Sequence, residues 1–484
     1  MIYRNLGQVS SHPSNNKSNI FNRILELEKL ETTVEGDPSG ILVVLGPRSC
    51  GKTALLSSHF SQRRDAVYIN CRVFDATTPQ YFVNEVLKVL MDKMSTLMKE
   101  KDWEQLKKKI LAGFASGFKS TMRGAEMTSW TFSPIELVKS IMSEDPAKNE
   151  EPDMNALIKA FKLLLDAWEK AIVTKSGGIA PGTPGEIMRR PVIVIDEANV
   201  MMDWNKDYTK DMHTLLRFFV SITKEQKRSH VFLVTSEYGY QTWLSAAIAS
   251  EFWAPRIIGD FTKSEAKRFF EFELQRRRKV VTVTDEIWSQ IYEVCGGNAG
   301  TLVNLAKALE DSGDDLNSKW EKALESMYRN TELPRLEKLA LGVDGVYTAA
   351  QFADATLLML SSQNFAAPQK AMLELLGRHD YALDIQGDNT PSSQTQLMIA
   401  GQKSFEGLVK YNVLCLRPYS DWALDIPLQA YSGPGKLALV TPSSALALYC
   451  LKLMKPDLDR YLTEWKQKQA PKAQKQSRKK WLWF

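Results

Sequence analysis

Two segments of the sequence contain residue types whose spacing could support phosphate chemistry. In the first, Gly46 is followed by Gly51, Lys52 and Thr53, which gives the pattern GxxxxGK[ST] of a phosphate-binding loop. Glycines let consecutive backbone N–H groups surround a polyphosphate, the lysine ammonium reaches the β and γ phosphates, and the threonine hydroxyl binds Mg²⁺. The residues expected to contact a nucleotide here are Gly46, Pro47, Arg48, Ser49, Cys50, Gly51, Lys52, Thr53 and Ala54.

The second segment, residues 191–198, reads PVIVIDEA and ends in two adjacent acids. Four consecutive β-branched residues predict a strand that is buried on both faces, as in a parallel sheet. Ligands of such sheets bind beyond the carboxyl ends of the strands, so the acids should face the phosphate-binding loop. We expect Asp196 to hold Mg²⁺, directly or through water, and Glu197 to orient and polarise the attacking water. An ordinary acidic turn is the alternative.

A parallel sheet with helices between its strands is expected to position both segments. The apolar run at 41–45 predicts a strand that leads into the phosphate-binding loop, and ALLSSHF after the loop predicts a helix. At the end of a later strand, Thr235 or Ser236 could contact the γ phosphate or the attacking water, although both also fit a simple strand terminus. The predicted strands span residues 41–45, 66–72, 191–198, 231–236 and 255–260.

Length and composition are typical of a soluble globular protein with about three domains. The 484 residues are 44% hydrophobic and 25% charged, with a net charge of +5. No run of about 18 apolar residues occurs, so no membrane span is expected. Five cysteines without a CxxC pair argue against disulfides or a zinc site and favour a reducing compartment. Without the apolar segment of a secretory signal, we expect an intracellular and mainly cytoplasmic protein, with the nucleus and organelles left open.

Changes in composition divide the chain into five regions. An acidic stretch at 143–153 and a Gly/Pro-rich stretch at 176–185 lie around the helical patterns of an insertion at about 78–175. Three lysines at 107–109 fit a solvated helix face better than a phosphate contact. The expected regions are a disordered N-terminus at 1–19, an α/β core at 20–260, a helical lid and linker at 261–341, a winged-helix-like domain at 342–456 and a basic tail at 457–484.

Taken together, these motifs resemble the additional-strand P-loop ATPases, and among them the archaeal-type ATPases of the signal-transduction (STAND) class. The matching segments, within about residues 20–310, are FNRILELEKL, GPRSCGKTALL, VYINCR, VIVIDEA, VFLVTS, IIGDFTKSEAKRFF and GGNAGTL. The resemblance implies an α/β, three-layer P-loop NTPase with a mostly parallel sheet, followed by a helical lid and a winged-helix-like α+β domain. It also implies ATP as the substrate, Mg²⁺ as the cofactor, and hydrolysis to ADP and phosphate.

In that family a lid segment of pattern GGxPG lies beside the base and ribose of the nucleotide. Gly296, Gly297 and Gly300 match this pattern, whereas Ala299 stands where proline is usual. The resemblance therefore assigns Gly297 and Asn298 to the nucleotide site.

Arginines could stabilise the transition state of phosphoryl transfer. Arg217 and Arg256 are the candidates, and a structural ion pair is the favoured role for each. Arg48 in the loop is expected to face solvent or a partner. Cys50 is expected to pack inside the loop, with an oxidation-sensitive thiol as the alternative.

The C-terminal third contains SFEGLVK, NVLCLRP and KLALVTPSSALALYCLKLM, which predict a helix, a strand, a turn, a strand and a helix in the order of a winged helix. The helix at 404–410 carries only Lys410 among its bases, so an intramolecular or protein-contact role is favoured over DNA reading. The segment at 466–484 combines basic residues with Trp481 and Trp483. It could contact nucleic acid, a membrane surface or a partner, but a disordered solvated tail is the favoured interpretation.

These observations favour an ATP-binding and slowly ATP-hydrolysing molecular switch, with an unidentified protein partner and nucleotide-dependent self-association. The alternative is a nucleic-acid-associated ATPase of the mobile-element, DNA-remodelling or effector type, which would use the winged helix and the basic tail. A third hypothesis is a scaffold that binds ATP without hydrolysing it. The adjacent Asp196 and Glu197 argue against that third hypothesis.

Overall fold

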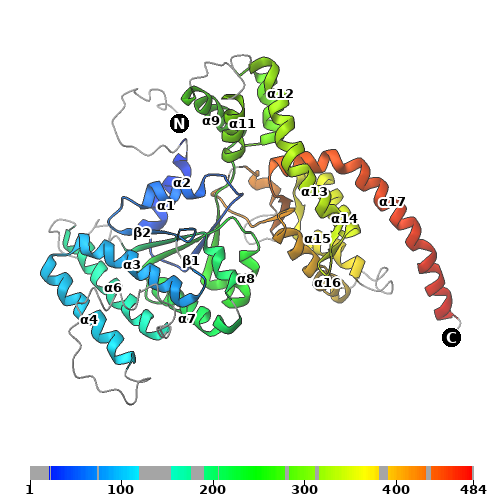
Figure 1. Ribbon diagram of the computed structural model, residues 1–484. Helices are drawn as coiled ribbons and strands as arrows, with labels where there is room; N and C mark the ends of the chain where they lie inside the picture. Colours follow the sequence, from blue (N-terminus) through cyan, green and yellow to red (C-terminus); the bar gives the residue numbers. More distant parts are fainter. Residues whose placement is uncertain are drawn as a thin grey trace, which may run out of the picture.

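A parallel sheet of five strands forms the centre of the N-terminal half of the molecule (Figure 1). The computed structural model describes residues 21, 23–73, 76–118, 154–175, 190–204, 206–277, 283–310, 316–380, 391–423, 425–431 and 438–481. The strands are β1 Ile41–Leu45, β2 Ala66–Asn70, β3 Val192–Asp196, β4 His230–Val234 and β5 Trp253–Ile257. Their spatial order is β2-β3-β4-β1-β5. Each of the five expected strands therefore has a counterpart, although β5 lies at 253–257 where 255–260 was expected. Strand β4 lies between the strand of the phosphate-binding loop and the strand that ends in Asp196.

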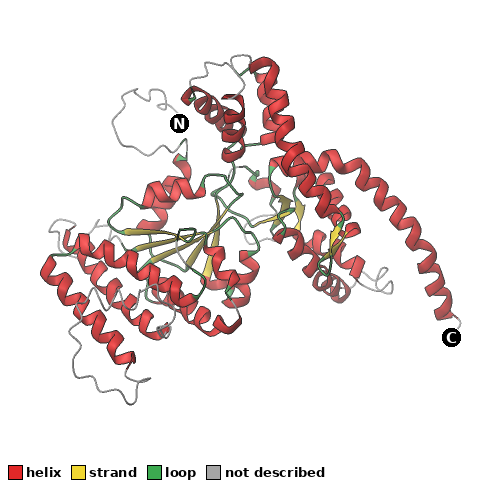
Figure 2. Ribbon diagram, viewed as in Figure 1, coloured by secondary structure: helices red, strands yellow, loops and turns green. Residues whose placement is uncertain are grey.

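Helices cover both faces of this sheet, which gives three layers (Figure 2). Successive strand residues point to opposite faces. Val44 and Val194 pack with α1 and α2 on one face, whereas Val43 and Ile195 belong to the core shared with α3, α6 and α7 on the other. Burial on both faces accounts for the uninterrupted apolar runs of β1 and β3. The bounds are α1 Ile24–Glu35, α2 Lys52–Phe60, α3 Pro79–Leu97, α6 Met154–Lys175, α7 Thr209–Val220 and α8 Tyr240–Ala247.

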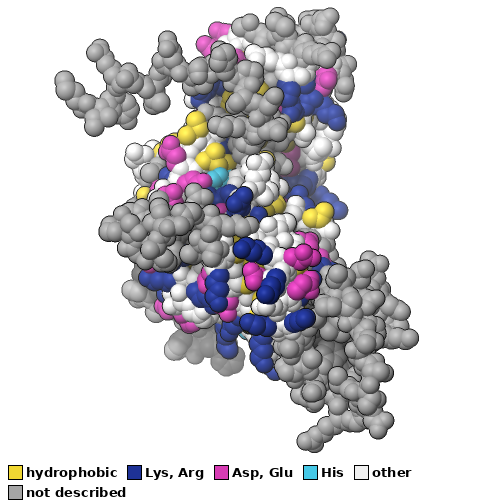
Figure 3. Space-filling model, turned by 90° about the vertical axis from the view of Figure 1, so that its left-hand side faces the viewer, with side chains coloured by type: hydrophobic (Ala, Val, Ile, Leu, Met, Phe, Trp, Pro, Cys, Tyr) yellow, Lys and Arg dark blue, Asp and Glu magenta, His cyan; other side chains and the backbone are white. Residues whose placement is uncertain are grey.

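The expected helical insertion contains α3, α4 Glu100–Phe118 and α6. Lys108 and Lys109 on α4 are exposed, as expected for a solvated face, whereas the Lys107 side chain is only 12% exposed and pairs with Glu104. On this side of the molecule, basic and acidic side chains are intermixed (Figure 3). The acidic stretch at 143–153, the Gly/Pro-rich stretch at 176–185 and the N-terminal segment at 1–19 lie outside the described residues.

The region expected to form the helical lid follows β5 and has an apolar core of its own. Thr262 and Glu265 form a capping box at the first helix of this region, with the Thr262 N–H donating to Glu265 Oε2 at 3.0 Å. Phe270, Ile291 and Leu305 come from three different helices of this core and are fully buried. The lid helices are α9 Lys263–Arg276, α10 Asp285–Cys295, α11 Ala299–Glu310 and α12 Leu316–Met327.

The C-terminal region is a helical unit with a small antiparallel sheet of order β8-β10-β9. Cys415 and Leu416 of β9 belong to the same apolar core as Tyr238 and Tyr240 near the end of β4, so this core continues from the N-terminal half into the C-terminal region. The elements are α13 Leu333–Ala340, β6 Gly342–Val343, β7 Tyr347–Thr348, α14 Ala349–Ser361, β8 Ala367–Pro368, α15 Gln369–Asp380, α16 Pro391–Lys410, β9 Leu414–Arg417 and β10 Leu439–Pro442.

A long helix, α17 Ala445–Trp481, ends the described chain and extends away from the body (Figure 1). Its first half packs through buried residues that include Cys450, Leu458 and Leu462. The backbone stays helical through 466–481, where we expected a disordered tail. The physical reason is composition, because Lys, Gln, Arg and Ala are good helix formers and predominate there. Within the described ranges we find no helix with both the length and the apolar character of a membrane span.

Candidate nucleotide-binding site

The phosphate-binding loop connects the end of β1 to the start of α2, as the sequence predicts. Gly51 has φ of +99°, a left-handed conformation that favours glycine. A Cβ atom on Gly46 would lie 2.2 Å from the Ile258 carbonyl oxygen, so only glycine fits against the end of β5. These two glycines bring the loop backbone to the carboxyl edge of the sheet.

Lys52 and Cys50 turn inward from this loop. The Lys52 ammonium donates to the carbonyl oxygens of Gly46 at 2.9 Å and Pro47 at 2.8 Å. Cys50 is fully buried, and its thiol donates to the Ile258 carbonyl oxygen at 3.3 Å. Burial raises the pKa of this thiol, and the nearby Lys52 charge opposes that shift only in part. Cys50 therefore has the expected packing role, and the oxidation-sensitive alternative loses support because the thiolate form is disfavoured.

The carboxyl end of β3 places Asp196 and Glu197 on the loop's side of the sheet edge. Asp196 is only 1% exposed, and its Oδ1 accepts from the Glu197 N–H at 3.0 Å. Glu197 has φ of +58° and forms an ion pair with Arg72. Burial raises the pKa of Glu197, while Arg72 opposes the shift.

Two residues, one within β2 and one just after it, complete this acidic edge, and sequence reasoning did not select either. The Tyr68 hydroxyl donates to Asp196 Oδ2, and Arg72 pairs with Glu197. Burial is the main cause of the raised pKa of Tyr68, followed by its hydrogen bond to Asp196, so the hydroxyl stays protonated. Both residues lie in VYINCR, but only the pairing of β2 with β3, with Asn70 opposite Asp196, brings them to the acids.

Thr235 and Ser236 follow β4 at the same edge of the sheet. The Thr235 hydroxyl donates to Asn199 Oδ1 at 3.0 Å and accepts from the Glu237 N–H at 2.9 Å. Glu237 in turn forms an ion pair with Arg48 of the phosphate-binding loop. Arg48 thus has an intramolecular partner, although its side chain is 63% exposed. Thr235 holds the segment after β4 beside the segment after β3.

The lid contacts the phosphate-binding loop directly through the glycine-rich segment. The Asn298 amide donates to the Arg48 carbonyl oxygen at 2.9 Å and to Asp260 Oδ1 at 3.0 Å. The Gly300 N–H donates to the Ser49 carbonyl oxygen at 2.9 Å. Gly297 lies so close to Phe261 that a Cβ atom would be 1.8 Å from its carbonyl oxygen. This packing brings Gly297 and Asn298 together with the loop, while their expected contact with the base and ribose stays a prediction.

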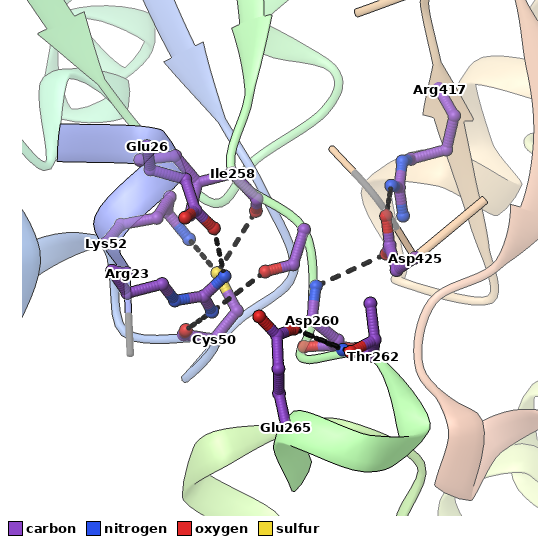
Figure 4. Close-up of polar contacts among 11 residues, drawn as sticks. Arg23, Glu26, Cys50, Lys52, Ile258, Asp260, Thr262, Glu265, Arg417 and Asp425 are labelled. Carbon is purple, nitrogen blue, oxygen red and sulfur yellow. Dashed lines mark hydrogen bonds and ion pairs between the residues drawn. The ribbon is translucent and has the colours of Figure 1, made fainter. Parts of the chain in front are cut away.

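Arg23, in the segment before α1, connects the loop to the β5–α9 turn (Figure 4). Its guanidinium donates to the carbonyl oxygens of Cys50 at 2.7 Å and Gly259 at 3.0 Å and pairs with Glu26 at 2.6 Å. The same group lies 4.2 Å from the Phe261 ring centroid. Arg23 lies in FNRILELEKL, one of the segments that carry the family resemblance, but its role could not be read from that segment because its contacts are with residues distant in the sequence.

The two candidate transition-state arginines are not brought to the loop. Arg217 is exposed on α7. The guanidinium of Arg256 on β5 lies 5.9 Å from the Trp422 ring centroid, and its Nη1 donates to the Pro255 carbonyl oxygen at 2.9 Å. Arg256 therefore packs against the C-terminal region.

The residues at this edge suit a magnesium–nucleotide complex better than a metal bound by protein alone. Among the described residues, no group of three or more His, Cys, Asp or Glu side chains could hold a metal ion. Mg²⁺ in nucleotide sites needs only one or two protein oxygens, because phosphates and water supply the rest. Thr53 and Asp196 offer such a pair, since the Tyr68 hydroxyl donates to Asp196 and the nearby Thr53 side chain lowers the pKa of the same hydroxyl.

The fold and the loop define a P-loop nucleotide-binding protein with an additional strand between β1 and β3. Residues 20–305 match the family model described as an ATPase domain predominantly from Archaea, and the chain belongs to that family.

Relatives of known sequence carry the same general description. An ATP-binding protein of Pyrococcus abyssi is 30% identical over 260 residues, which cover 52% of this chain and 63% of the relative. An ATP-binding protein of Methanocaldococcus jannaschii is 26% identical over 286 residues, covering 57% and 66%. The chain thus spans just under two thirds of the length of these curated relatives. Among solved structures, a Walker-type ATPase of Pyrococcus abyssi has a TM-score of 0.49 at 15% identity, covering 92% of this chain and 99% of that one.

Proposed function

We propose that this ATPase-domain protein is an intracellular, Mg²⁺-dependent molecular switch of the STAND type, which hydrolyses ATP slowly. In this proposal Lys52 contacts the β and γ phosphates, after exchanging its bonds to loop carbonyls for phosphate oxygens. Thr53 and Asp196 hold Mg²⁺, which neutralises charge on the phosphates. Glu197 orients the attacking water, and Thr235 or Ser236 contacts the γ phosphate or that water. The five buried, unpaired cysteines support the intracellular location.

The main observation in support of a switch is that the β9–β10 loop packs against the end of β5. The Ile257 N–H donates to Ser420 Oγ at 3.0 Å, and the Asp260 N–H donates to Asp425 Oδ2 at 3.3 Å. Trp422 is 5% exposed and packs in the apolar core of β1 and α2. A loop of the C-terminal region therefore lies against the strand next to β1.

A short chain of hydrogen bonds leads from this loop to the phosphate-binding loop. Asp425 bonds to the backbone of Asp260, Asp260 accepts from Asn298, and Asn298 donates to the carbonyl oxygen of Arg48. Nucleotide binding that moves the loop backbone would change the same bonds that position the lid and the C-terminal loop. This shared network supports coupling between ATP turnover and the C-terminal region.

The order α14, β8, α15, α16, β9, β10 supports a winged-helix assignment for the C-terminal region. In a winged helix the β9–β10 connection is the wing, and here that connection contacts the nucleotide-binding half. The third helix, α16, carries only Lys403 and Lys410 as bases. We therefore propose an intramolecular role, with a protein partner, over DNA reading.

The first experiment tests nucleotide binding through Lys52. Lys52→Ala should weaken ATP binding at least tenfold, since charge-assisted hydrogen bonds to phosphate contribute about 1.5–3 kcal/mol. Calorimetry with ATP measures the change, and Lys108→Ala, at an exposed lysine of α4, is the control. Full binding and turnover by Lys52→Ala would rule out the proposal.

The second experiment separates the docked loop from β5. A Cβ atom on Gly259 would lie 2.3 Å from Asp425 Oδ1, which is itself fixed by Arg417 Nη2 at 2.7 Å, so Gly259→Ala should displace the loop. We expect release of a fluorescent ADP to be faster by about tenfold, the effect of losing about 1.4 kcal/mol. Gly239→Ala is the control, because a Cβ atom there meets nothing within 4 Å. Equal release rates would contradict coupling.

Self-association is tested separately by light scattering with ATP, with ADP and without nucleotide. A mass that changes with the nucleotide would support switching by assembly, and a constant mass would restrict the switch to changes within one chain.

A further inference from the structure

Tyr68 occupies the position between the two residues proposed to bind Mg²⁺. It lies in the middle of β2, where its register partner is Val194 of β3, two residues before Asp196. Its hydroxyl donates to Asp196 Oδ2, and the Thr53 side chain is near enough to this hydroxyl to lower its pKa. A single tyrosine thus connects the sheet strand that ends in the acid with the first turn of α2.

The contacts of Asp196 leave its carboxylate in one orientation. Oδ1 accepts from the Glu197 N–H at 3.0 Å, and Oδ2 accepts from Tyr68. A carboxylate oxygen has two acceptor sites, so each oxygen can still bind a metal ion or a metal-bound water. The ring of Tyr68 is itself held, because it packs against the apolar core that contains Val194 and Leu55.

We infer that Tyr68 is a positioning residue for Mg²⁺, which holds the Asp196 carboxylate toward Thr53 and the phosphate-binding loop. This inference rests on the proposed Mg²⁺–nucleotide chemistry and adds a residue outside both motifs. Removal of a hydrogen-bond partner of a metal-binding carboxylate typically lowers metal affinity by about 10- to 100-fold. For loss of the Tyr68 hydroxyl we therefore expect metal affinity to fall by at least about tenfold.

The test uses Tyr68→Phe, which removes the hydroxyl and keeps the ring. Affinity for a fluorescent ADP is measured with Mg²⁺ and with EDTA, and Mn²⁺ binding to the ADP complex is measured by electron paramagnetic resonance. We expect Mn²⁺ affinity to fall about tenfold while ADP affinity in EDTA stays unchanged. Tyr81→Phe is the matched control, since Tyr81 is 44% exposed on α3.

A second variant separates positioning from general damage to the site. If Tyr68 acts through Asp196, the losses of metal affinity in Tyr68→Phe and Asp196→Asn should not add in the double variant. Additive losses, an unchanged Mn²⁺ affinity, or an equal loss of ADP affinity in EDTA would overturn the inference. If the wild-type protein bound ADP without any effect of Mg²⁺, the proposed function itself would fail.

Discussion

Asp425 accepts a hydrogen bond from the backbone N–H of Asp260 at 3.3 Å, although the two residues are 165 positions apart in the sequence. The contact brings two carboxylates close together at the β5–α9 turn. Arg417, only 4% exposed, pairs with Asp425 at 2.7 Å, and Asn298 donates to Asp260. The turn thus joins the sheet, the lid and the C-terminal region in one polar cluster.

This cluster predicts a pH-dependent stability. Burial, followed by the charge of Asp425, raises the pKa of Asp260 to about 6, although Asn298, Arg417 and Arg23 oppose the shift. The ordinary value for aspartate is about 3.9, so the folded state holds its proton more tightly than the unfolded state. Stability from this group is therefore complete below about pH 4 and is lost as the pH rises through about 6. Between about pH 5 and about pH 8 the free energy of unfolding should fall by about 1.4 kcal/mol.

Asp260→Asn should remove this contribution, because an amide imitates the protonated acid. At about pH 8 the variant should unfold at a higher urea concentration than the wild type. This difference in midpoint should become smaller as the pH is lowered to about 5. Asp457→Asn, at an exposed position of α17, is the control. A difference that does not change with pH would contradict the assignment.

The ion pair between Arg72 and Glu197 predicts a shift in the pH dependence of hydrolysis. Arg72 opposes the raised pKa of Glu197, so Arg72→Ala should raise that pKa further. The acidic limb of the kcat profile should move to higher pH, and the shift should be modest, because an Arg72 side chain that is 67% exposed is partly screened by solvent. Steady-state rates across pH measure the shift. The profile of Arg64→Ala, at an exposed arginine before β2, should match the wild type, and a shift toward lower pH in Arg72→Ala would disprove the pairing.

The close approach of Gly300 to Ser49 leads to the prediction that tight packing of the lid on the loop is needed for nucleotide affinity. Alanine normally favours a helix over glycine by about 1 kcal/mol. Here a Cβ atom would lie 2.4 Å from Ser49 Cβ, so Gly300→Ala should push α11 away from the phosphate-binding loop. We expect ADP affinity to fall about tenfold by calorimetry, as for a loss of about 1.4 kcal/mol. Gly239→Ala again provides the control, and unchanged affinity in Gly300→Ala would show that the lid contact is dispensable.

The basic end of α17 allows a test of the nucleic-acid alternative. Lys466 pairs with Asp354 at 3.5 Å, so a truncation that removes 469–484 keeps the last described ion pair of the helix. We expect no gel shift of duplex DNA at moderate salt with either form. A gel shift that requires 469–484 and weakens with salt would favour the alternative function. For each phosphate contacted, the logarithm of the binding constant should then fall by about 0.9 per tenfold increase in salt concentration.

The sequence by itself determined the parts of the site that depend on adjacent residues. The phosphate-binding loop and the pair Asp196 and Glu197 could be predicted from local spacing, and strands β1 to β4 from their apolar runs. The bounds of β5, which is only partly buried and contains Pro255 and Arg256, were predicted less well. The order of the strands and the contacts of Tyr68, Arg23, Asn298 and Asp425 were decided only by the tertiary structure. These residues act across separations that no local pattern encodes, since their positions depend on which strands pair and on how the lid and the β9–β10 loop pack against β5.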